Sequence, residues 1–240
     1  MIQAVRKVWA VYGIVVFGIQ LLAWTPITTI FLLVFGSRAE KTIIWTGHHM
    51  IASATLFLTG VLRVQHNRQA LQGKAPFVIV SNHRSFLDIL INASSYPGVY
   101  KFLSKEEMTK IPVWGISVRR LGIVVDRKSA ASRSESMERM RQALHTGFSI
   151  LLYPEGTRNR TGQPLLDFYD GAFRLAAETG FPIAVMTLHD PRKYCDPRRG
   201  LDLSPGIVNV HWDVIEGTGG KTVEKLKEET RAAMLTHLPS

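Results

Sequence analysis

The sequence predicts an α/β fold with a mostly parallel sheet flanked by helices, preceded by an N-terminal membrane-associated helical hairpin. Two observations support this prediction. Asp, Glu, Lys and Arg are absent from residues 8–37 and 42–62, although the chain as a whole has a formal net charge of +10. From about residue 64 onward, short apolar runs alternate with amphipathic stretches, as in folds where strands alternate with helices. We therefore expect a membrane-anchoring helical segment at 1–63 and an α/β domain at 64–240.

The first apolar stretch is long enough to span a bilayer, which needs about 20 apolar residues, but Pro26 can kink or break the helix. The second stretch, which contains His48 and His49, is more polar. Basic residues mark the cytoplasmic side of membrane segments, and they flank both stretches on every side: Arg6, Lys7, Arg38, Lys41, Arg63 and Arg68. A hairpin that enters and leaves on the cytoplasmic side therefore fits at least as well as two crossings. A buried core hairpin is the alternative.

The α/β domain has a regular succession of expected elements. Apolar runs predict strands at 76–80, 123–125, 149–153, 183–188 and 207–215, and amphipathic periodicity predicts helices beginning at 86 and covering 135–146, 172–178 and 222–237. Ligands of such sheets bind beyond the carboxyl ends of the strands. We therefore expect the catalytic and binding residues to follow the predicted strands.

The charge and cysteine content narrow the possible partners. A net charge of +10 suits nucleic acid, an anionic lipid surface or an anionic substrate. The basic residues form no arm or aromatic-interleaved patch, so we expect membrane lipid and no nucleic acid. Cys195 is the only cysteine, which excludes an intrachain disulfide and fits a reducing compartment. Its neighbours suggest an exposed loop.

The first motif, NHRSFLD at 82–88, directly follows a predicted strand. A carboxylate on one imidazole nitrogen fixes the tautomer and leaves the other nitrogen free as a base. The His83–Asp88 spacing therefore suggests a dyad that deprotonates a hydroxyl without a serine or cysteine nucleophile. Alternatively, Ser85 caps a helix and the histidine and aspartate are incidental.

Two further motifs follow predicted strands. In YPEGTR at 153–158, Gly156 permits close backbone approach, while Thr157 and Arg158 offer donors suited to phosphate. Glu155 could accept from a hydroxyl or hold basic partners, and a plain turn is the alternative. In LGIVVDR at 121–127, Arg127 could bind phosphate or pair with its neighbouring aspartate. We expect no metal ligands in these motifs.

Together these blocks resemble the glycerolipid acyltransferase family typified by 1-acylglycerol-3-phosphate acyltransferases. NHRSFLD matches its NHxxxxD motif, GIVVDR and YPEGTR its second and third blocks, and FPIAVMTL its fourth, in the family's order over about residues 76–188. The resemblance implies a His–Asp dyad that activates an acceptor hydroxyl to attack an acyl thioester. It also implies a substrate site lined by Asn82, Arg127, Glu155, Gly156, Thr157 and Arg158.

The expected activity is transfer of a fatty acyl group from acyl-CoA or acyl carrier protein to a lysophospholipid, most simply 1-acylglycerol-3-phosphate giving phosphatidate, with no bound cofactor. The expected location is the membrane, with the catalytic domain at 64–240 facing the cytoplasm. Other acceptors, such as a lyso-ornithine lipid or lysophosphatidylcholine, remain open. Two other classes also remain: a metal-dependent phosphoesterase using His83, Asp88 and Glu155, and a non-catalytic protein that binds anionic lipid.

Overall fold

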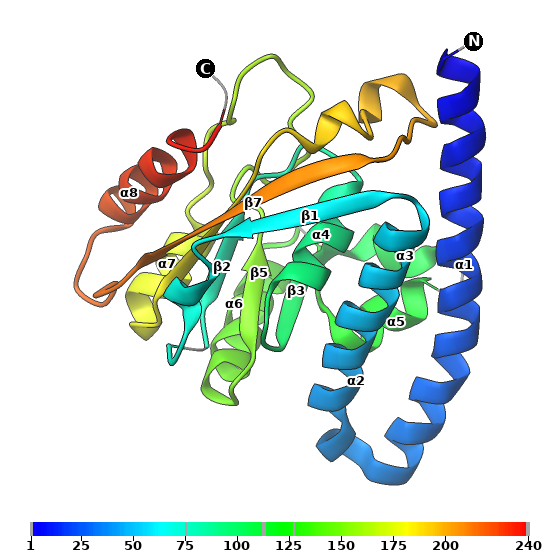
Figure 1. Cartoon of the computed structure of the whole chain (residues 1–240). Helices are drawn as coiled ribbons and strands as arrows, with labels where there is room; N and C mark the ends of the chain where they lie inside the picture. The colour runs from blue at the N-terminus through cyan, green and yellow to red at the C-terminus, as the bar shows by residue number, and fades with distance from the viewer. Residues whose placement is uncertain (1, 75, 112–113, 127, 239–240) are drawn as a thin grey trace.

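The computed structural model describes residues 2–74, 76–111, 114–126 and 128–238. Its centre is a seven-stranded sheet in the order β1-β7-β6-β2-β5-β3-β4 (Figure 1). All neighbouring pairs are parallel except β6 and β7, which are antiparallel. The strands are β1 (Val61–His66), β2 (Val78–Ser81), β3 (Tyr100–Lys105), β4 (Ile123–Val125), β5 (Ser149–Leu152), β6 (Ile183–Leu188) and β7 (Gly206–Ile215). The predicted α/β fold with a mostly parallel sheet is confirmed.

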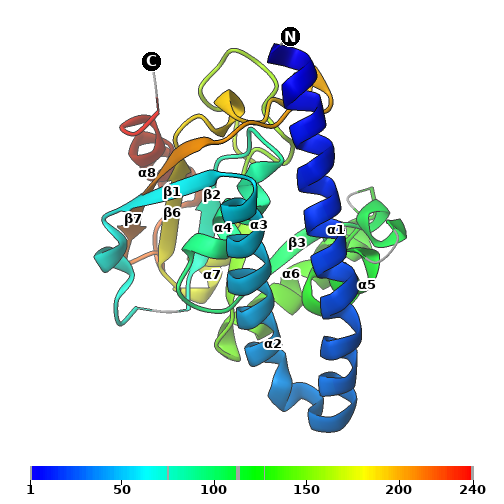
Figure 2. The same cartoon turned by 45° about the vertical axis from the view of Figure 1, so that its right-hand side comes forward.

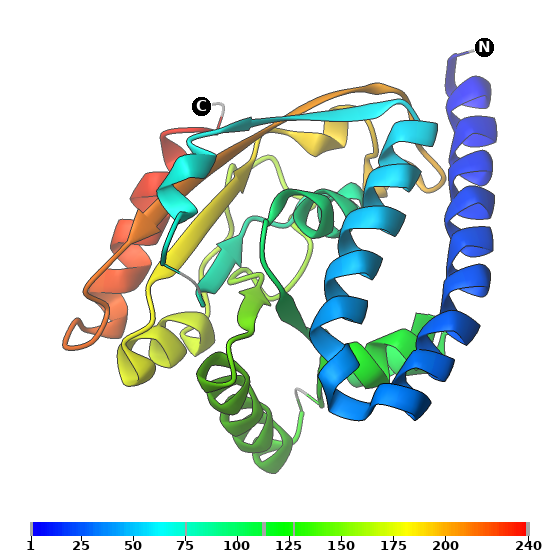
Figure 3. The same ribbon diagram turned by 60° about the horizontal axis from the view of Figure 1, so that its bottom comes forward.

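Helices cover both faces of the sheet (Figure 3). On one face lie α6 (Ala130–His145), α7 (Gly171–Thr179) and α8 (Val223–Leu235), and on the other lie α4 (Leu87–Ser95) and the N-terminal hairpin. Successive strand side chains point to opposite faces. In β2, Val78 and Val80 accordingly join the core beneath α6–α8, and Ile79 joins the core beneath α4. Both faces of the central strands are buried, as expected of a parallel sheet.

The hairpin consists of α1 (Ile2–Phe35), which runs through Pro26, and a second arm made of α2 (Glu40–Thr46), the π-helical turn η2 (Gly47–Ile51) and α3 (Ala52–Leu58). Figures 1 and 2 show the two arms side by side, joined by a turn at one end. Among the described residues, Ile2–Leu58 is the one helical stretch whose length and composition would suit a membrane crossing, and 11% of its most apolar window is buried. Much of α1 therefore presents apolar side chains to its surroundings.

The hairpin is attached to the sheet domain at the start of each arm. At the start of α1, the Arg6 guanidinium pairs with the Asp202 carboxylate (Nη2–Oδ2 2.9 Å) and donates to Ser204 Oγ at 2.8 Å. At the start of α2, Glu40 pairs with Lys101 on β3 at 2.5 Å. In between, a Cβ on Gly13 would lie 2.8 Å from Leu203, so the helix packs too closely there for a larger residue. The two arms are thus fixed to the sheet domain near Arg6 and near Glu40.

Three elements of the domain are absent from the sequence-based prediction: β1, β3 and α5 (Trp114–Leu121). Strand β1 begins at Val61, inside the segment we expected to be purely helical, and pairs with β7. The division into segments 1–63 and 64–240 stays a prediction. Cys195 is buried, contrary to the exposed loop we expected, because its segment packs against the loop after β2.

Candidate active site

The ends of the parallel strands bring the predicted motifs together. Strands β2 and β5 are direct neighbours in the sheet and run in the same direction. Residues 82–88 follow β2 and residues 153–158 follow β5, so both loops lie at the same edge of the sheet. The arrangement confirms that these polar residues gather beyond the strand ends, where ligands of open α/β sheets bind.

His83 and Asp88 form a hydrogen-bonded dyad. His83 Nδ1 lies 2.8 Å from Asp88 Oδ2, and the same oxygen accepts from the backbone N–H groups of Arg84 at 2.6 Å and Ser85 at 2.8 Å. Asp88 is completely buried in the first turn of α4. A proton on Nδ1 that is donated to Asp88 leaves the lone pair of His83 Nε2 free, which is the state of a general base.

Two side chains fix the imidazole ring from other directions. The Tyr153 ring stacks on the His83 ring with centroids 4.0 Å apart and planes 16° apart. The Arg158 guanidinium lies 3.8 Å above the Phe86 ring, and its Nε is 3.4 Å from His83 Nε2. Arg158 Nε–H donates to His83 Nε2, so this guanidinium can hold an anionic group of a substrate next to the base.

Two of the predicted substrate-binding residues are directed into the protein. Glu155 is 2% exposed, and its two carboxylate oxygens accept from the backbone N–H groups of His83 and Leu166, each at 2.9 Å. Burial raises the pKa of Glu155, and these two hydrogen bonds oppose that shift. The Asn82 amide is fully buried and both donates to and accepts from the Leu188 backbone. Both side chains hold the His83 loop in place.

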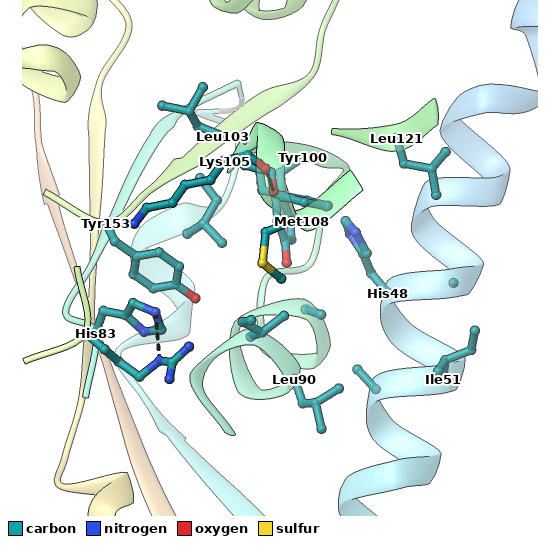
Figure 4. Close-up of a pocket in the computed structure, with 18 of the residues that line it drawn as sticks. His48, Ile51, His83, Leu90, Tyr100, Leu103, Lys105, Met108, Leu121 and Tyr153 are labelled. Carbon is teal, nitrogen blue, oxygen red and sulfur yellow. Dashed lines mark hydrogen bonds between the residues drawn. The ribbon is translucent and has the colours of Figure 1, made fainter. Parts of the chain in front are cut away.

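A cavity of about 760 Å³ opens at His83 and extends to the hairpin (Figure 4). Four of the predicted site residues line it: His83, Gly156, Thr157 and Arg158. Gly156 has a φ of +66°, a left-handed conformation that favours glycine. The rest of the lining is predominantly apolar. The cavity therefore joins a polar end at the dyad to an apolar interior.

Several lining residues were missed from the sequence. At the polar end these are Lys105, which ends β3, together with Tyr153 and Arg160. In Figure 4 the Lys105 side chain reaches toward Tyr153 and His83. At the apolar end the hairpin contributes an entire wall: Phe17, Leu21, Trp24, Ile44, Gly47, His48, Ile51 and Ala52. No local sequence signal marks Lys105 or the hairpin wall, because only the packing of β3 and of the hairpin brings these residues to the cavity.

Arg127, the remaining predicted phosphate ligand, lies outside the described residues. Within the part of the chain that the structure describes, no group of three or more His, Cys, Asp or Glu side chains is arranged so that it could hold a metal ion.

Two curated relatives of this chain are named 1-acyl-sn-glycerol-3-phosphate acyltransferases. The chain is 35% identical over 172 residues to a chloroplast 1-acyl-sn-glycerol-3-phosphate acyltransferase of Brassica napus, covering 70% of this chain and 48% of that protein. It is 32% identical over 165 residues to the human 1-acyl-sn-glycerol-3-phosphate acyltransferase alpha, covering 67% of this chain and 58% of the relative. The chain thus spans about half the length of the curated relatives it matches.

A solved structure shares the whole fold. The crystal structure of the lysophosphatidate acyltransferase PlsC from Thermotoga maritima matches with a TM-score of 0.82, covering 98% of this chain and 95% of that chain at 18% identity. The resemblance of the sequence blocks is confirmed by a family model described as acyltransferase, which matches residues 62–189, more than half of the 240 residues. The chain is therefore a member of the acyltransferase family.

Proposed function

We propose that this protein transfers a fatty acyl group from an acyl thioester to the free hydroxyl of 1-acylglycerol-3-phosphate, giving phosphatidate. His83 Nε2 removes the hydroxyl proton, the oxygen attacks the thioester carbonyl, and the C–S bond breaks as the ester forms. The proton on His83 then passes to the departing thiolate. The observation that carries the proposal is the Asp88-oriented His83 at the polar end of a largely apolar cavity.

The cationic residues at the polar end suit a phosphate. Arg158 offers paired donors and is held over Phe86, and Lys105 and Arg160 add positive charge to the cavity wall. Arg127 belongs to the same proposed site because it matches the family's second block. Gly156 and Thr157 line the cavity next to Arg158, where the Thr157 hydroxyl can donate to a phosphate oxygen. Asn82 and Glu155 act by positioning His83.

The apolar hairpin supports attachment to a membrane, with the active site on its cytoplasmic side. Apolar side chains of α1 are exposed along its length, from Ile2 at 77% to Leu33 at 80%. Because α1 is fixed to the sheet domain at Arg6 and the second arm is fixed to it at Glu40, a helix embedded along the membrane surface fits this arrangement better than one that crosses it. The lysolipid would then enter from the lipid, while acyl-CoA or acyl carrier protein approaches from the cytosol.

The test is an acylation assay on a panel of lysolipids with both thioester donors, comparing wild type with His83→Ala. The alanine variant should lose about 10²–10⁴-fold in turnover, the usual contribution of a general base, while its thermal unfolding stays that of a folded protein. A folded variant that retains more than about a tenth of wild-type turnover would contradict a base at this position. Turnover that is lost on chelation would favour a metal-dependent phosphoesterase instead.

A further inference from the structure

The hairpin end of the cavity contains polar side-chain atoms that have no partner. Among the described residues, His48 Nδ1 and Trp24 Nε1 are buried and make no hydrogen bond, although both side chains line the cavity. Tyr100 lies on the facing wall of the cavity and is 3% exposed. Buried polar groups are nearly always paired in folded proteins, so two unpaired groups at one end of a cavity require a physical explanation.

The backbone places His48 in this wall by a special local conformation. His48 lies in the π-helical turn η2, which interrupts the second arm of the hairpin. Single π-helical turns are rare and are frequent at functional sites. The His48 ring stacks on Tyr100 with centroids 4.3 Å apart, and Figure 4 shows it pointing from the helix into the cavity. Gly47 allows the close approach of Trp24, because a Cβ there would lie 3.0 Å from Trp24 Nε1.

The protonation of His48 follows from its surroundings. Burial lowers the pKa of His48 to about 3, so the ring is neutral at neutral pH and carries one N–H. Nδ1 is enclosed by protein atoms, so the ring presents Nε2 to the cavity. An orphaned N–H is rarer than an under-satisfied acceptor, so the hydrogen belongs on Nε2. The wall therefore offers two donors to a cavity occupant: His48 Nε2–H and the Tyr100 hydroxyl.

Resting on the acyl transfer proposed above, we propose that this end of the cavity binds the hydroxyl or keto oxygen of an oxygen-bearing fatty acyl chain through His48 and Tyr100. The neighbouring wall is apolar, with Phe17, Leu21 and Ile51 close by in the hairpin arms. A chain that is hydrocarbon except for one oxygen matches this lining. The arm of a thioester carrier contains amide groups, which need hydrogen-bond partners along its length. The polar residues that could supply these partners lie at the opposite end of the cavity, around His83.

The experiment compares plain fatty acyl-CoA with a positional series of monohydroxylated acyl-CoA of the same length, the hydroxyl being near the carbonyl, at mid-chain or near the methyl end. For one position in the series, wild type should prefer the hydroxylated donor. His48→Phe keeps a ring against Tyr100 and removes both nitrogens, so the ratio of kcat/KM for hydroxylated over plain donor should fall about fivefold to tenfold, the equivalent of one hydrogen bond. Tyr100→Phe removes a single oxygen and should act in the same direction.

The matched control is His49→Phe. The adjacent His49 ring stacks on Trp45, its Nδ1 lies 2.9 Å from the Trp45 carbonyl oxygen, and it does not line the cavity. This variant should leave the donor ratio as in wild type. A wild-type enzyme without preference at any position, or a ratio that is unchanged in both His48→Phe and Tyr100→Phe, would overturn the oxygen site while leaving acyl transfer intact. Failure to transfer any donor would overturn the acyl transfer itself.

Discussion

The two ends of the cavity are built in different ways. The polar end comes from two short loops after β2 and β5, in which neighbouring residues are fixed by hydrogen bonds from backbone N–H groups. The hairpin end is assembled from α1, α2, η2, α3, β3 and α5, whose residues meet only through tertiary packing. The catalytic residues thus come from contiguous sequence motifs, whereas the shape of the cavity depends on elements that are far apart in the chain.

The first way to test this comparison is to remove the hairpin wall. A chain that begins at Val61 keeps β1 but loses every lining residue of α1–α3. Loss of apolar contact with three or four methylene groups, at about 0.8 kcal/mol each, should lower kcat/KM on detergent-dispersed acceptor about 10²-fold. Steady-state kinetics on the shortened chain, checked for folding by circular dichroism, measures the effect. Near-full activity of the shortened chain would mean that the hairpin serves only as an anchor.

A substitution pair tests the same wall in the full chain. Leu21 lines the cavity, whereas its neighbour Leu22 is 59% exposed. Leu21→Trp should fill the interior and shift donor preference toward shorter acyl chains, and Leu22→Trp should leave that preference unchanged. Chain-length profiles that move equally in both variants would contradict the assigned wall.

The polar end predicts a smaller and more selective effect. Arg158→Lys keeps the charge but loses the planar pair of donors, which bind phosphate in a bidentate manner. The KM for the lysolipid acceptor should therefore rise about tenfold, equivalent to one charge-assisted hydrogen bond, with little change in the KM for the thioester. Kinetics with each substrate varied in turn separates the two. A rise confined to the thioester KM would assign Arg158 to the donor.

The smallest effect should come from the link that fixes the start of α1. Burial would raise the pKa of Asp202, but hydrogen bonds from Arg6 and from the Asp196 backbone outweigh it and lower that pKa. A lowered pKa stabilises the fold above the unfolded value of about 4, and this stabilisation is lost as pH falls through the folded value. Asp202→Asn should cost about 1 kcal/mol at neutral pH.

Urea unfolding of wild type and Asp202→Asn across acidic and neutral pH checks this expectation. The stability difference between the two should shrink steadily below about pH 4. A difference that is the same at all pH values would mean that Asp202 contributes through shape and not through its charge.

Sequence reasoning succeeded where a residue's role is set by its local neighbours. The five-residue spacing of His83 and Asp88 places both in one loop and one helical turn, so the dyad could be predicted. Residue type alone does not say whether a carboxylate faces a ligand or a backbone N–H, which is why Glu155 was expected in the cavity and is found beneath it. Lys105 and Leu21 were missed because only the packing of β3 and α1 brings them to the site.

The three hydrogen bonds on Asp88 Oδ2 have a consequence for the temperature dependence of the reaction. They orient the carboxylate, and through it the imidazole, before any substrate binds. Freezing a side-chain rotation costs roughly 1 kcal/mol in entropy. In this protein that entropy is lost during folding, before the reaction begins. The activation entropy therefore includes little loss of side-chain rotation by His83. The entropy that is still lost on the way to the transition state comes from ordering the lipid and the thioester.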